Sequence, residues 1–223
     1  MYKHLYDEIA KRWYRGRGNS IWIISDPHFS DEGMKYLRKD YIGDAEQVKK
    51  INSRVSRDDT LVILGDIGNV DFVKELHGYK VLIMGNHDKG ASNYKREKHY
   101  YSNLGELFVD DLSGIERSEI RVEDNHLFDE VYEGPLMIND RVILSHEPIP
   151  VPDYMFNIHG HDHSNWYKDE NSLNVCAEHI NYIPVNLGSL IKEGLLKNVT
   201  DIHRETIDKA IKRKAKKITQ SEE

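Results

Sequence analysis

The sequence predicts an α/β fold. Between residues 20 and 88, short apolar runs alternate with segments of helical periodicity, and this βαβαβ order is typical of parallel strands joined by helical crossovers. From residue 130 the pattern changes to one strand after another, which predicts a second, partly antiparallel sheet. The chain has 223 residues, of which 39% are hydrophobic, and this is enough for one packed core. We therefore expect a single domain over residues 1–223.

The first half begins with a predicted helix, because Leu5, Ile9 and Trp13 recur every four residues. A second helix is predicted to start at Asp44, which we expect to cap it. The apolar face of that helix carries Ala45, Val48, Ile51 and Val55. The other elements expected here are a strand at 21–25, a loop at 30–43, a strand at 61–64, a short helix near 70–77 and a strand at 80–84.

Residues 89–130 interrupt this rhythm. They are charged, rich in Asn, Asp, Ser and Tyr, and show little apolar periodicity. We predict that they form an insertion. A segment of this kind either decorates the surface or takes part in a nearby functional cleft, and the sequence leaves both open.

The second half is predicted to consist mainly of strands, followed by a helical tail at 200–223. Asn139-Asp140 predicts a tight hairpin turn between the first two strands. The tail has Glu205–Lys209 and Asp208–Lys212 pairs at helical spacing. The strands are expected at 130–138, 141–145, 155–159, 172–176 and 183–187.

Composition excludes several broad classes of protein. The net charge of −7 argues against a general nucleic-acid binder, although residues 89–99 and 209–217 are locally basic. No apolar run reaches the roughly 18–20 residues of a membrane span, and the N-terminus lacks the apolar stretch of a secretory signal. A single cysteine, Cys176, allows no internal disulfide, so the cytoplasm is the expected compartment. We interpret Cys176 as a small buried strand residue rather than a nucleophile.

Five short polar motifs carry the functional signal. Each follows an apolar run that is expected to be a buried strand, and each contains carboxylate, imidazole or amide groups that can bind a metal ion. Because ligands bind outside the carboxyl ends of strands in open α/β sheets, we expect the motifs to converge. They are Asp26-Pro27-His28, Gly65-Asp66, Gly85-Asn86-His87-Asp88, Ser145-His146 and Gly160-His161-Asp162-His163.

The number of donors favours two metal ions rather than one. A catalytic ion takes about three or four protein ligands and keeps a position open, so seven donors are too many for one ion. Mixed nitrogen and oxygen ligands without a thiolate favour Mn²⁺ first, with Fe, Zn²⁺, Co²⁺ or Ni²⁺ as alternatives. The seven donors are Asp26, His28, Asp66, Asn86, His146, His161 and His163.

Taken together, the motifs D-x-H, G-D, G-N-H-D/E, H and G-H-x-H resemble the pattern of the calcineurin-like metallophosphoesterase superfamily. The resemblance covers roughly residues 20–190. The segment Asn181-Tyr182-Ile183-Pro184-Val185 is similar to small bacterial and phage members. The resemblance implies a four-layer α/β/β/α sandwich of two mixed β-sheets flanked by helices.

The resemblance also implies a role for each motif residue. One metal is expected on Asp26, His28, Asp66 and His163, and the other on Asp66, Asn86, His146 and His161, so that Asp66 bridges them. His87 corresponds to the catalytic histidine near the leaving group, and Asp88 is expected to orient it. In this chemistry, hydroxide held between two cations attacks phosphorus in line, and His87 donates a proton to the leaving oxygen. His159 lies outside the pattern and is interpreted as a strand residue or a supporting partner.

The expected substrate is a small phosphorylated molecule, with nucleotides and nucleic-acid ends among the candidates. Gly65-Asp66 is not followed by the Arg-Gly of the related protein phosphatases, which argues against a protein substrate. The insertion contains basic and aromatic residues that suit a phosphate and a base, namely Lys89, Tyr94, Lys95, Arg96 and Tyr100. The sequence leaves open the preference for mono- or diesters and the oligomeric state.

Two other classes of protein are weighed against this hypothesis. A non-catalytic metal-binding scaffold of the same fold would typically have lost ligands or the catalytic histidine, and this chain keeps all of them. A helical His-Asp phosphohydrolase would need His87-Asp88 on a helix. Glycine and β-rich runs flank that pair instead.

Overall fold

The computed structural model describes residues 13, 20–38, 40–88, 96–97, 121–122, 127–164, 169–200, 209 and 211–212, with the backbone alone at 96–97 and 121–122. Three sequence-based expectations therefore lie outside the described residues: the N-terminal helix apart from Trp13, most of the 89–130 insertion, and most of the C-terminal helix.

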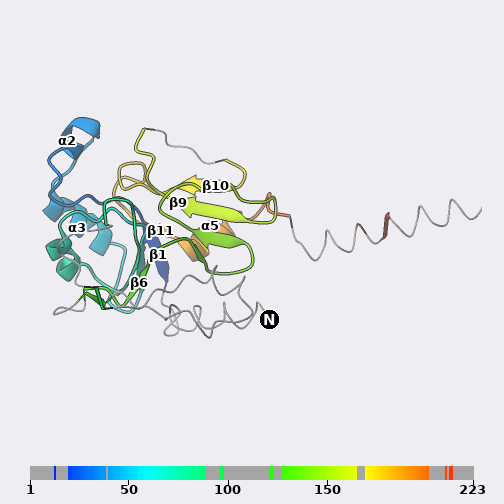
Figure 1. The fold of residues 1–223 in the computed structure, drawn as a ribbon, viewed down its shortest axis with the longest axis horizontal. Helices are drawn as coiled ribbons and strands as arrows, with labels where there is room; N and C mark the ends of the chain where they lie inside the picture. Colours follow the sequence, from blue (N-terminus) through cyan, green and yellow to red (C-terminus); the bar gives the residue numbers. More distant parts are fainter. Residues whose placement is uncertain are drawn as a thin grey trace, which may run out of the picture.

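A five-stranded sheet contains the predicted βαβαβ segment (Figure 1). Its order is β11-β1-β2-β3-β6, in which β1, β2, β3 and β6 are parallel and β11 is antiparallel to β1. The strands are β1 (Ile21–Ile24), β2 (Thr60–Ile63), β3 (Tyr79–Ile83), β6 (Glu130–Tyr132) and β11 (Val185–Asn186). Ile24 of β1 pairs with Ile63 of β2, and Ile63 pairs with Leu82 of β3, so these three strands end at one edge.

A second sheet of four strands has the order β10-β9-β8-β7. In it β8, β9 and β10 are parallel and β7 is antiparallel to β8, so both sheets are mixed. The strands are β7 (Leu136–Met137), β8 (Val142–Leu144), β9 (Phe156–His159) and β10 (Ser172–Asn174). A separate antiparallel pair joins β4 (Arg96–Glu97) to β5 (Arg121–Val122) within the insertion.

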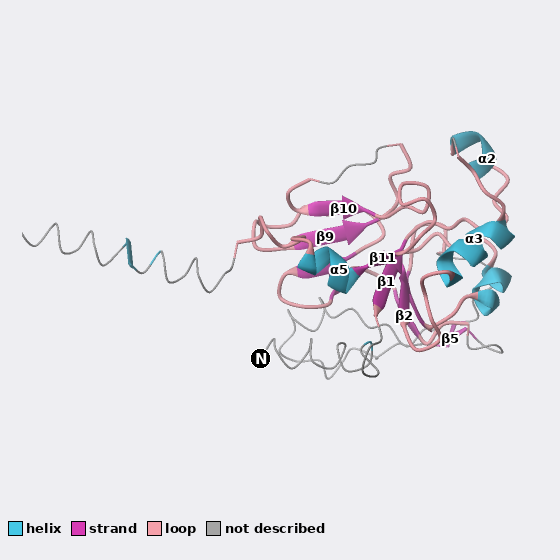
Figure 2. Ribbon diagram, turned by 180° about the vertical axis from the view of Figure 1, so that it is seen from behind, coloured by secondary structure: helices cyan, strands magenta, loops and turns pink. Residues whose placement is uncertain are grey.

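Helices flank the sheets. Figures 1 and 2 show α3 (Asp44–Asn52) on the side of the five-stranded sheet that faces away from β9 and β10, and α2 (Met34–Leu37) projecting from the body. The 3₁₀ helix η1 (Val70–Glu75) joins β2 to β3, and α5 (Leu187–Lys192) follows β11 and packs against β1. The α/β fold class with two mixed sheets and flanking helices is therefore confirmed.

The strands β1 and β2 of the first sheet are apolar on both faces because both faces are covered. Ile21 and Ile23 belong to the core between the two sheets, whereas Trp22 and Ile24 belong to the core beneath α3 and η1. Successive side chains of a strand point to opposite faces, so a doubly covered strand becomes a continuous apolar run. The same alternation holds from Leu61 to Leu64.

Two local predictions in the first half were wrong. The expected loop at 30–43 contains the short helix α2. The cap of α3 is Gly43, and Asp44 is its first helical residue. The Asp44 carboxylate instead accepts hydrogen bonds from the backbone N–H and hydroxyl of Ser30, each at 3.0 Å. The Asp44 side chain therefore binds Ser30, 14 residues away, instead of capping its own helix as local preference predicted.

The predicted strand at 130–138 is two strands in two different sheets. β6 extends the first sheet beside β3, and β7 joins the second sheet beside β8. Gly134-Pro135 lies between them, and proline has no N–H with which to continue a ladder. The hairpin prediction at Asn139 is confirmed, since its side chain accepts the backbone N–H groups of Arg141 and Val142, each at 2.8 Å.

The predicted strand at 183–187 is shorter than expected and lies in the first sheet. β11 has two residues, and α5 begins directly after Asn186, whose side chain accepts the backbone N–H of Ser189 at 2.9 Å. This cap favours the start of the helix at Leu187, because an N-cap side chain satisfies a free N–H of the first helical turn. The strand therefore ends at Asn186.

The core between the sheets predicts a stability test. Ile23 is fully buried there, so Ile23→Ala should lower the free energy of unfolding by about 2–5 kcal/mol, measured by urea denaturation. Ile191→Ala, at a side chain that is 38% exposed, should change it by no more than about 0.5 kcal/mol. Equal losses in the two variants would contradict the core assigned here.

Candidate metal centre

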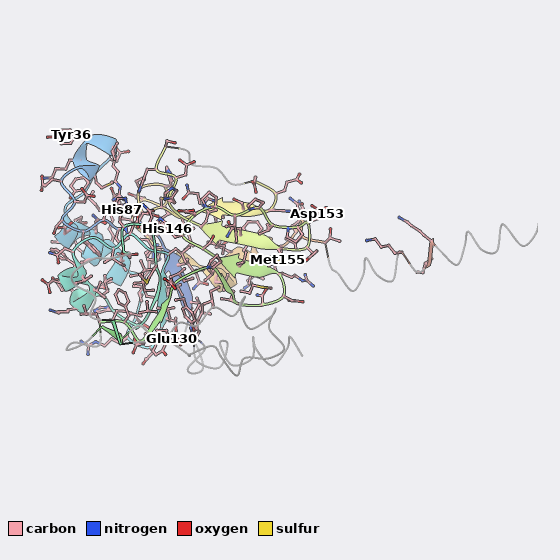
Figure 3. All side chains as sticks on the ribbon, viewed as in Figure 1. Tyr36, His87, Glu130, His146, Asp153 and Met155 are labelled. Carbon is pink, nitrogen blue, oxygen red and sulfur yellow. The ribbon has the colours of Figure 1, made fainter. Side chains whose placement is uncertain are left out.

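All nine sequence-predicted site residues follow the carboxyl end of a strand. Asp26 and His28 follow β1, and Asp66 follows β2. The segment after β3 carries Asn86, His87 and Asp88. In the second sheet, His146 follows β8, and the 160–163 loop follows β9. Figure 3 labels His87 and His146, which come from different sheets and both reach the carboxylate of Asp66.

The two sheets are joined directly beneath the site. Ser25, the residue after β1, forms an isolated parallel β-bridge with Cys176, which lies just beyond the end of β10. The Ser25 N–H donates to Val175 O at 3.0 Å, and its hydroxyl donates to Leu64 O at 2.7 Å. This connection brings the polar loops of both sheets to one place.

Glycines in the motifs permit this close approach. A Cβ at Gly85 would lie 2.2 Å from Asp66 Oδ1, and a Cβ at Gly160 would lie 2.1 Å from Asp26 Oδ2. Gly65 has φ of +88°, and a Cβ there would lie 2.4 Å from the backbone nitrogen of Gly85. Any side chain at these positions would push the loops apart, which explains the glycine in three of the five motifs.

The first cluster consists of Asp26, His28 and His163, whose ligand atoms all lie within 4.8 Å of one another. Asp26 Oδ1 lies 3.9 Å from His28 Nε2 and 3.6 Å from His163 Nε2. Asp26 Oδ1 and His28 Nε2 are buried, and neither has a hydrogen-bond partner among the described residues. Buried polar atoms are normally satisfied, so two such atoms aimed at one point fit a cation between them.

The second cluster consists of Asp66, His146 and His161. Asn86 joins it, with its Oδ1 2.8 Å from His146 Nε2 and 3.1 Å from His161 Nδ1. The other ring nitrogen of His146 lies 2.8 Å from Leu64 O, which can only accept, so this nitrogen carries the proton. In the neutral ring, Nε2 then carries a lone pair that faces Asn86 Oδ1, which is also an acceptor. A cation bound by both atoms would remove the repulsion between them.

Asp66 connects the two clusters. Its Oδ2 lies 3.6 Å from His28 Nε2 and 3.5 Å from His146 Nε2. Its Oδ1 accepts the backbone N–H of His87 at 2.9 Å, which fixes the orientation of the carboxylate. The seven donors named from the sequence are therefore brought together in two groups that share one carboxylate. This arrangement suits a pair of metal ions.

The protonation state of His28 also fits metal binding. Burial lowers the pKa of His28 to about 4, against an opposing effect of Asp26, so this ring is neutral at pH 7 as a ligand must be. Burial also lowers the pKa of His163, but the hydrogen bond with Glu178 and the negative charges of Asp26 and Glu178 together outweigh it and raise the pKa overall, so a metal ion at this ring would have to displace a proton. The Nδ1 of His28 lies 3.3 Å from Asp31 Oδ2, which leaves Nε2 to face the cluster.

The His87 side chain stands at the open side of the site, 67% exposed, with its Nε2 3.9 Å from Asp66 Oδ2. Asp88 is buried, and its carboxylate accepts backbone N–H groups of Asp66, Ile67 and Gly85 at 2.8–3.1 Å. These bonds hold the loops after β2 and β3 together. The expectation that Asp88 orients the His87 ring stays a prediction.

Arg38 and Glu178 contact the first cluster and were missed from the sequence. Glu178 follows β10, so the rule of polar residues after strand ends could have found it. Arg38 lies in a segment expected to be a plain loop, and no local signal marks it. His159 and Cys176 are buried as expected, although Cys176 lies just beyond β10. Burial raises the pKa of the Cys176 thiol, which donates to Asp26 Oδ2 at 3.3 Å.

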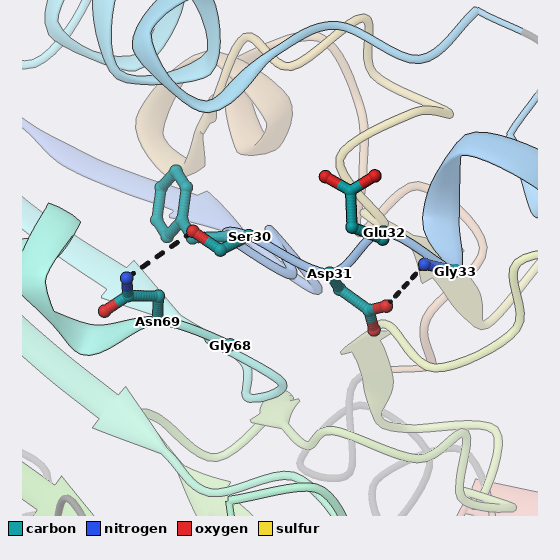
Figure 4. Close-up of a pocket in the computed structure, with 7 residues that line it drawn as sticks. Ser30, Asp31, Glu32, Gly33, Gly68 and Asn69 are labelled. Carbon is teal, nitrogen blue, oxygen red and sulfur yellow. Dashed lines mark hydrogen bonds between the residues drawn. The ribbon is translucent and has the colours of Figure 1, made fainter.

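A shallow open groove of about 650 Å³ begins beside the first cluster (Figure 4). Asp31, which contacts His28, forms part of its wall, and Asn69 donates to Ser30 across it at 3.4 Å. Its lining residues are Phe29, Ser30, Asp31, Glu32, Gly33, Gly68 and Asn69. The carboxylates of Asp31 and Glu32 at this rim make the groove unfavourable for an anion.

Two of three comparisons with known proteins found a match. The sequence profile of the Calcineurin-like phosphoesterase family matches residues 20–183. A crystal structure of a protein of unknown function from Aquifex aeolicus is similar to this chain, with a TM-score of 0.51 and 22% identity, over 78% of this chain and 99% of that one. At this identity the likeness shows the fold alone. A comparison with curated proteins found no match. The described part of the chain contains no helix whose length and apolar character would let it cross a membrane.

Substitution of a motif glycine tests the close approach. In Gly160→Ala the new methyl would lie 1.9 Å from Ser25 Oγ and 2.1 Å from Asp26 Oδ2, so Asp26 must move. We expect a loss of about 1–3 kcal/mol in the free energy of unfolding and weaker binding of Mn²⁺, measured by urea denaturation and calorimetry. Gly134→Ala, where a Cβ has nothing within 4 Å, is the matched control and should keep its metal affinity. Unchanged metal affinity in Gly160→Ala would show that the loops can separate freely.

Proposed function

Because the chain belongs to the calcineurin-like phosphoesterase family, we propose that it is a metal-dependent phosphoesterase that hydrolyses phosphate esters with two divalent ions. The family generally binds divalent metals, and the chain contains candidate ligand clusters for them. The observation that carries the proposal is the shared carboxylate of Asp66, which lies 3.6 Å from a ligand atom of the first cluster and 3.5 Å from one of the second.

The donor set supports Mn²⁺ as the occupant, with Fe, Zn²⁺, Co²⁺ and Ni²⁺ as alternatives. Carboxylate and imidazole groups make up both clusters, and an amide joins the second. The neighbouring Cys176 thiol stays protonated and donates a hydrogen bond to Asp26. When bound, two such ions would activate water for attack on phosphorus and neutralise the charge on the phosphoryl oxygens.

The chain itself supplies orientation and a proton. Leu64 O and Asp31 hold the outer nitrogens of His146 and His28, so that each ring presents its Nε2 inward. We propose that His87, exposed above Asp66, donates a proton from Nε2 to the leaving oxygen. Its backbone is fixed by the bond to Asp66 Oδ1, which keeps the ring close to the reacting phosphate.

The proposed substrate is a small phosphorylated molecule, with nucleotides and nucleic-acid ends as candidates. The side chains of Asn86, His87 and His161 are exposed, so a phosphate can reach the clusters from solvent. The expected contribution of the 89–130 insertion to substrate choice falls outside the described residues and stays a proposal, as does the cytoplasmic location.

A non-catalytic metal-binding scaffold is the alternative function, and the presence of every donor and of His87 supports an enzyme over it. The helical His-Asp phosphohydrolase is excluded, because His87-Asp88 lies in a turn after β3 rather than on a helix.

Metal removal tests the proposal directly. Protein stripped with a chelator should lose hydrolysis of nitrophenyl phosphate and bis-nitrophenyl phosphate, and two equivalents of Mn²⁺ per chain should restore it. Asp66→Asn should weaken both ions, because the shared carboxylate neutralises two dications, and metal analysis should fall from two ions toward none. A fully active preparation with one ion per chain would rule out the paired site. Two bound ions without hydrolysis of any phosphate ester would favour the scaffold.

His87→Ala should keep both ions and lose most activity. General acid catalysis is typically worth about 10²–10⁴-fold, and the loss should be smaller for nitrophenolate than for an alkoxide leaving group, which needs more protonation. The measurement is kcat for a matched pair of aryl and alkyl phosphate esters, with metal content as the control. An equal loss for both leaving groups would assign His87 to phosphate orientation instead.

A further inference from the structure

Behind the first cluster lies a buried ion pair that none of the roles above uses. Arg38 is 3% exposed, and its Nε lies 3.1 Å from Glu178 Oε2. Arg38 follows α2 and Glu178 follows β10, so the pair connects the loop between β1 and α3 with the second sheet. Charges are costly to bury, and a pair in this position points to a specific role for its two members.

Glu178 determines how His163 faces the first cluster. Its Oε1 lies 2.6 Å from His163 Nδ1. A carboxylate accepts the proton on Nδ1, so the lone pair of His163 lies on Nε2, the nitrogen that is 3.6 Å from Asp26 Oδ1. A carboxylate behind a ligating imidazole fixes the ring and strengthens it as a ligand.

Arg38 reaches the remaining part of the same cluster. Its guanidinium donates to the carbonyl oxygens of Asp26 at 2.5 Å and Pro27 at 3.3 Å, within the segment that carries Asp26 and His28. It also stacks over the Tyr182 ring at 5.9 Å, which holds it in place. One side chain therefore contacts the backbone of one ligand segment and the carboxylate behind the third ligand.

The second cluster has a different kind of support. His146 is held by the carbonyl of Leu64, and Asp66 is held by the backbone N–H of His87. Neither of these contacts passes through Arg38 or Glu178. The backbone N–H of His161 donates to Asp26 Oδ2 at 2.9 Å, so Arg38 is linked to the second cluster through Asp26, whereas Glu178 contacts His163 of the first cluster. Substitution of Glu178 is therefore the change that separates the two halves of the site.

We propose that Arg38 and Glu178 are a positioning pair that sets the metal affinity of the first cluster and leaves that of the second cluster unchanged. This inference rests on the proposed function, because it requires both clusters to bind ions. It makes the occupancy of one metal position dependent on the segment that contains α2.

The test isolates each cluster and titrates it with Mn²⁺ by calorimetry. His161→Ala removes a donor of the second cluster, so that the tighter position in this background is the first cluster, and His28→Ala makes the second cluster the tighter position in the same way. Glu178→Gln keeps the shape of the side chain and removes its charge. We expect it to weaken Mn²⁺ binding by about 10–100-fold in the first background and to leave binding unchanged in the second. Glu178→Asp should restore part of the lost affinity.

The controls separate positioning from loss of fold. Lys74→Gln breaks an exposed ion pair of similar length, 2.8 Å to Asp71, and should change neither affinity. Arg38→Lys keeps the positive charge but cannot reach both carbonyls and Glu178, so it should act as Glu178→Gln does. In the chain with both clusters intact, the exchange-coupled paramagnetic resonance signal of a Mn²⁺ pair should disappear from both variants at metal concentrations that saturate the wild type.

The outcomes distinguish the two proposals. A wild-type chain that binds no divalent ion would overturn the proposed function. A wild-type chain that binds two, with both affinities equally reduced or equally unchanged in Glu178→Gln and Arg38→Lys, would overturn the positioning role and leave the phosphoesterase proposal standing.

Discussion

The close approach of the strand-end loops from two sheets is the constraint on which the rest of the site depends. Ser25 pairs with Cys176 across the sheets, and Gly160 leaves no room for a methyl against Asp26 Oδ2. This contact brings acceptors from five loops within a few ångströms of one another. Carboxylate and lone-pair nitrogen atoms that face each other repel, so the fold concentrates an electrostatic cost that a cation relieves. The same arrangement that is unfavourable for the chain alone is what makes it a candidate metal site.

Backbone strain is concentrated at the same residues. Asp26, His28, Asp66 and His161 have φ values of +54°, +46°, +51° and +69°, in the left-handed region that side chains other than glycine seldom adopt. Such conformations cost about 1–3 kcal/mol each and persist only where surrounding bonds hold them. Here Asp26 N–H donates to Gly65 O, and His28 N–H donates to Asp66 O. The two clusters nevertheless differ in character, because a buried ion pair supports the first and backbone groups support the second.

The sequence by itself determined the elements whose signals are local. β1, β2 and the second half of β3 from Val81 are covered on both faces, so each contributes an apolar run that periodicity detects. The polar motifs follow those runs directly, and the parallel order of the strands places the motifs at one edge. The seven candidate donors could therefore be named from the sequence, and the structure places them close together, while their role as ligands stays a prediction. The Asn139 hairpin was equally predictable, since its hydrogen bonds span three residues at most.

Only the tertiary structure decided which sheet each short strand joins and what supports the ligands. β6 and β7 lie in different sheets although three residues separate them, because a strand of two or three residues is assigned by its neighbours in space. The Asp44 side chain likewise binds Ser30 rather than capping α3, because this contact forms only in the folded chain. Arg38 and Glu178 are 140 residues apart, the difference between 178 and 38, and no local pattern records their contact. The candidate ligands were visible in the sequence because each of the five motifs directly follows a strand, whereas the contacts behind them exist only after the two sheets have packed together.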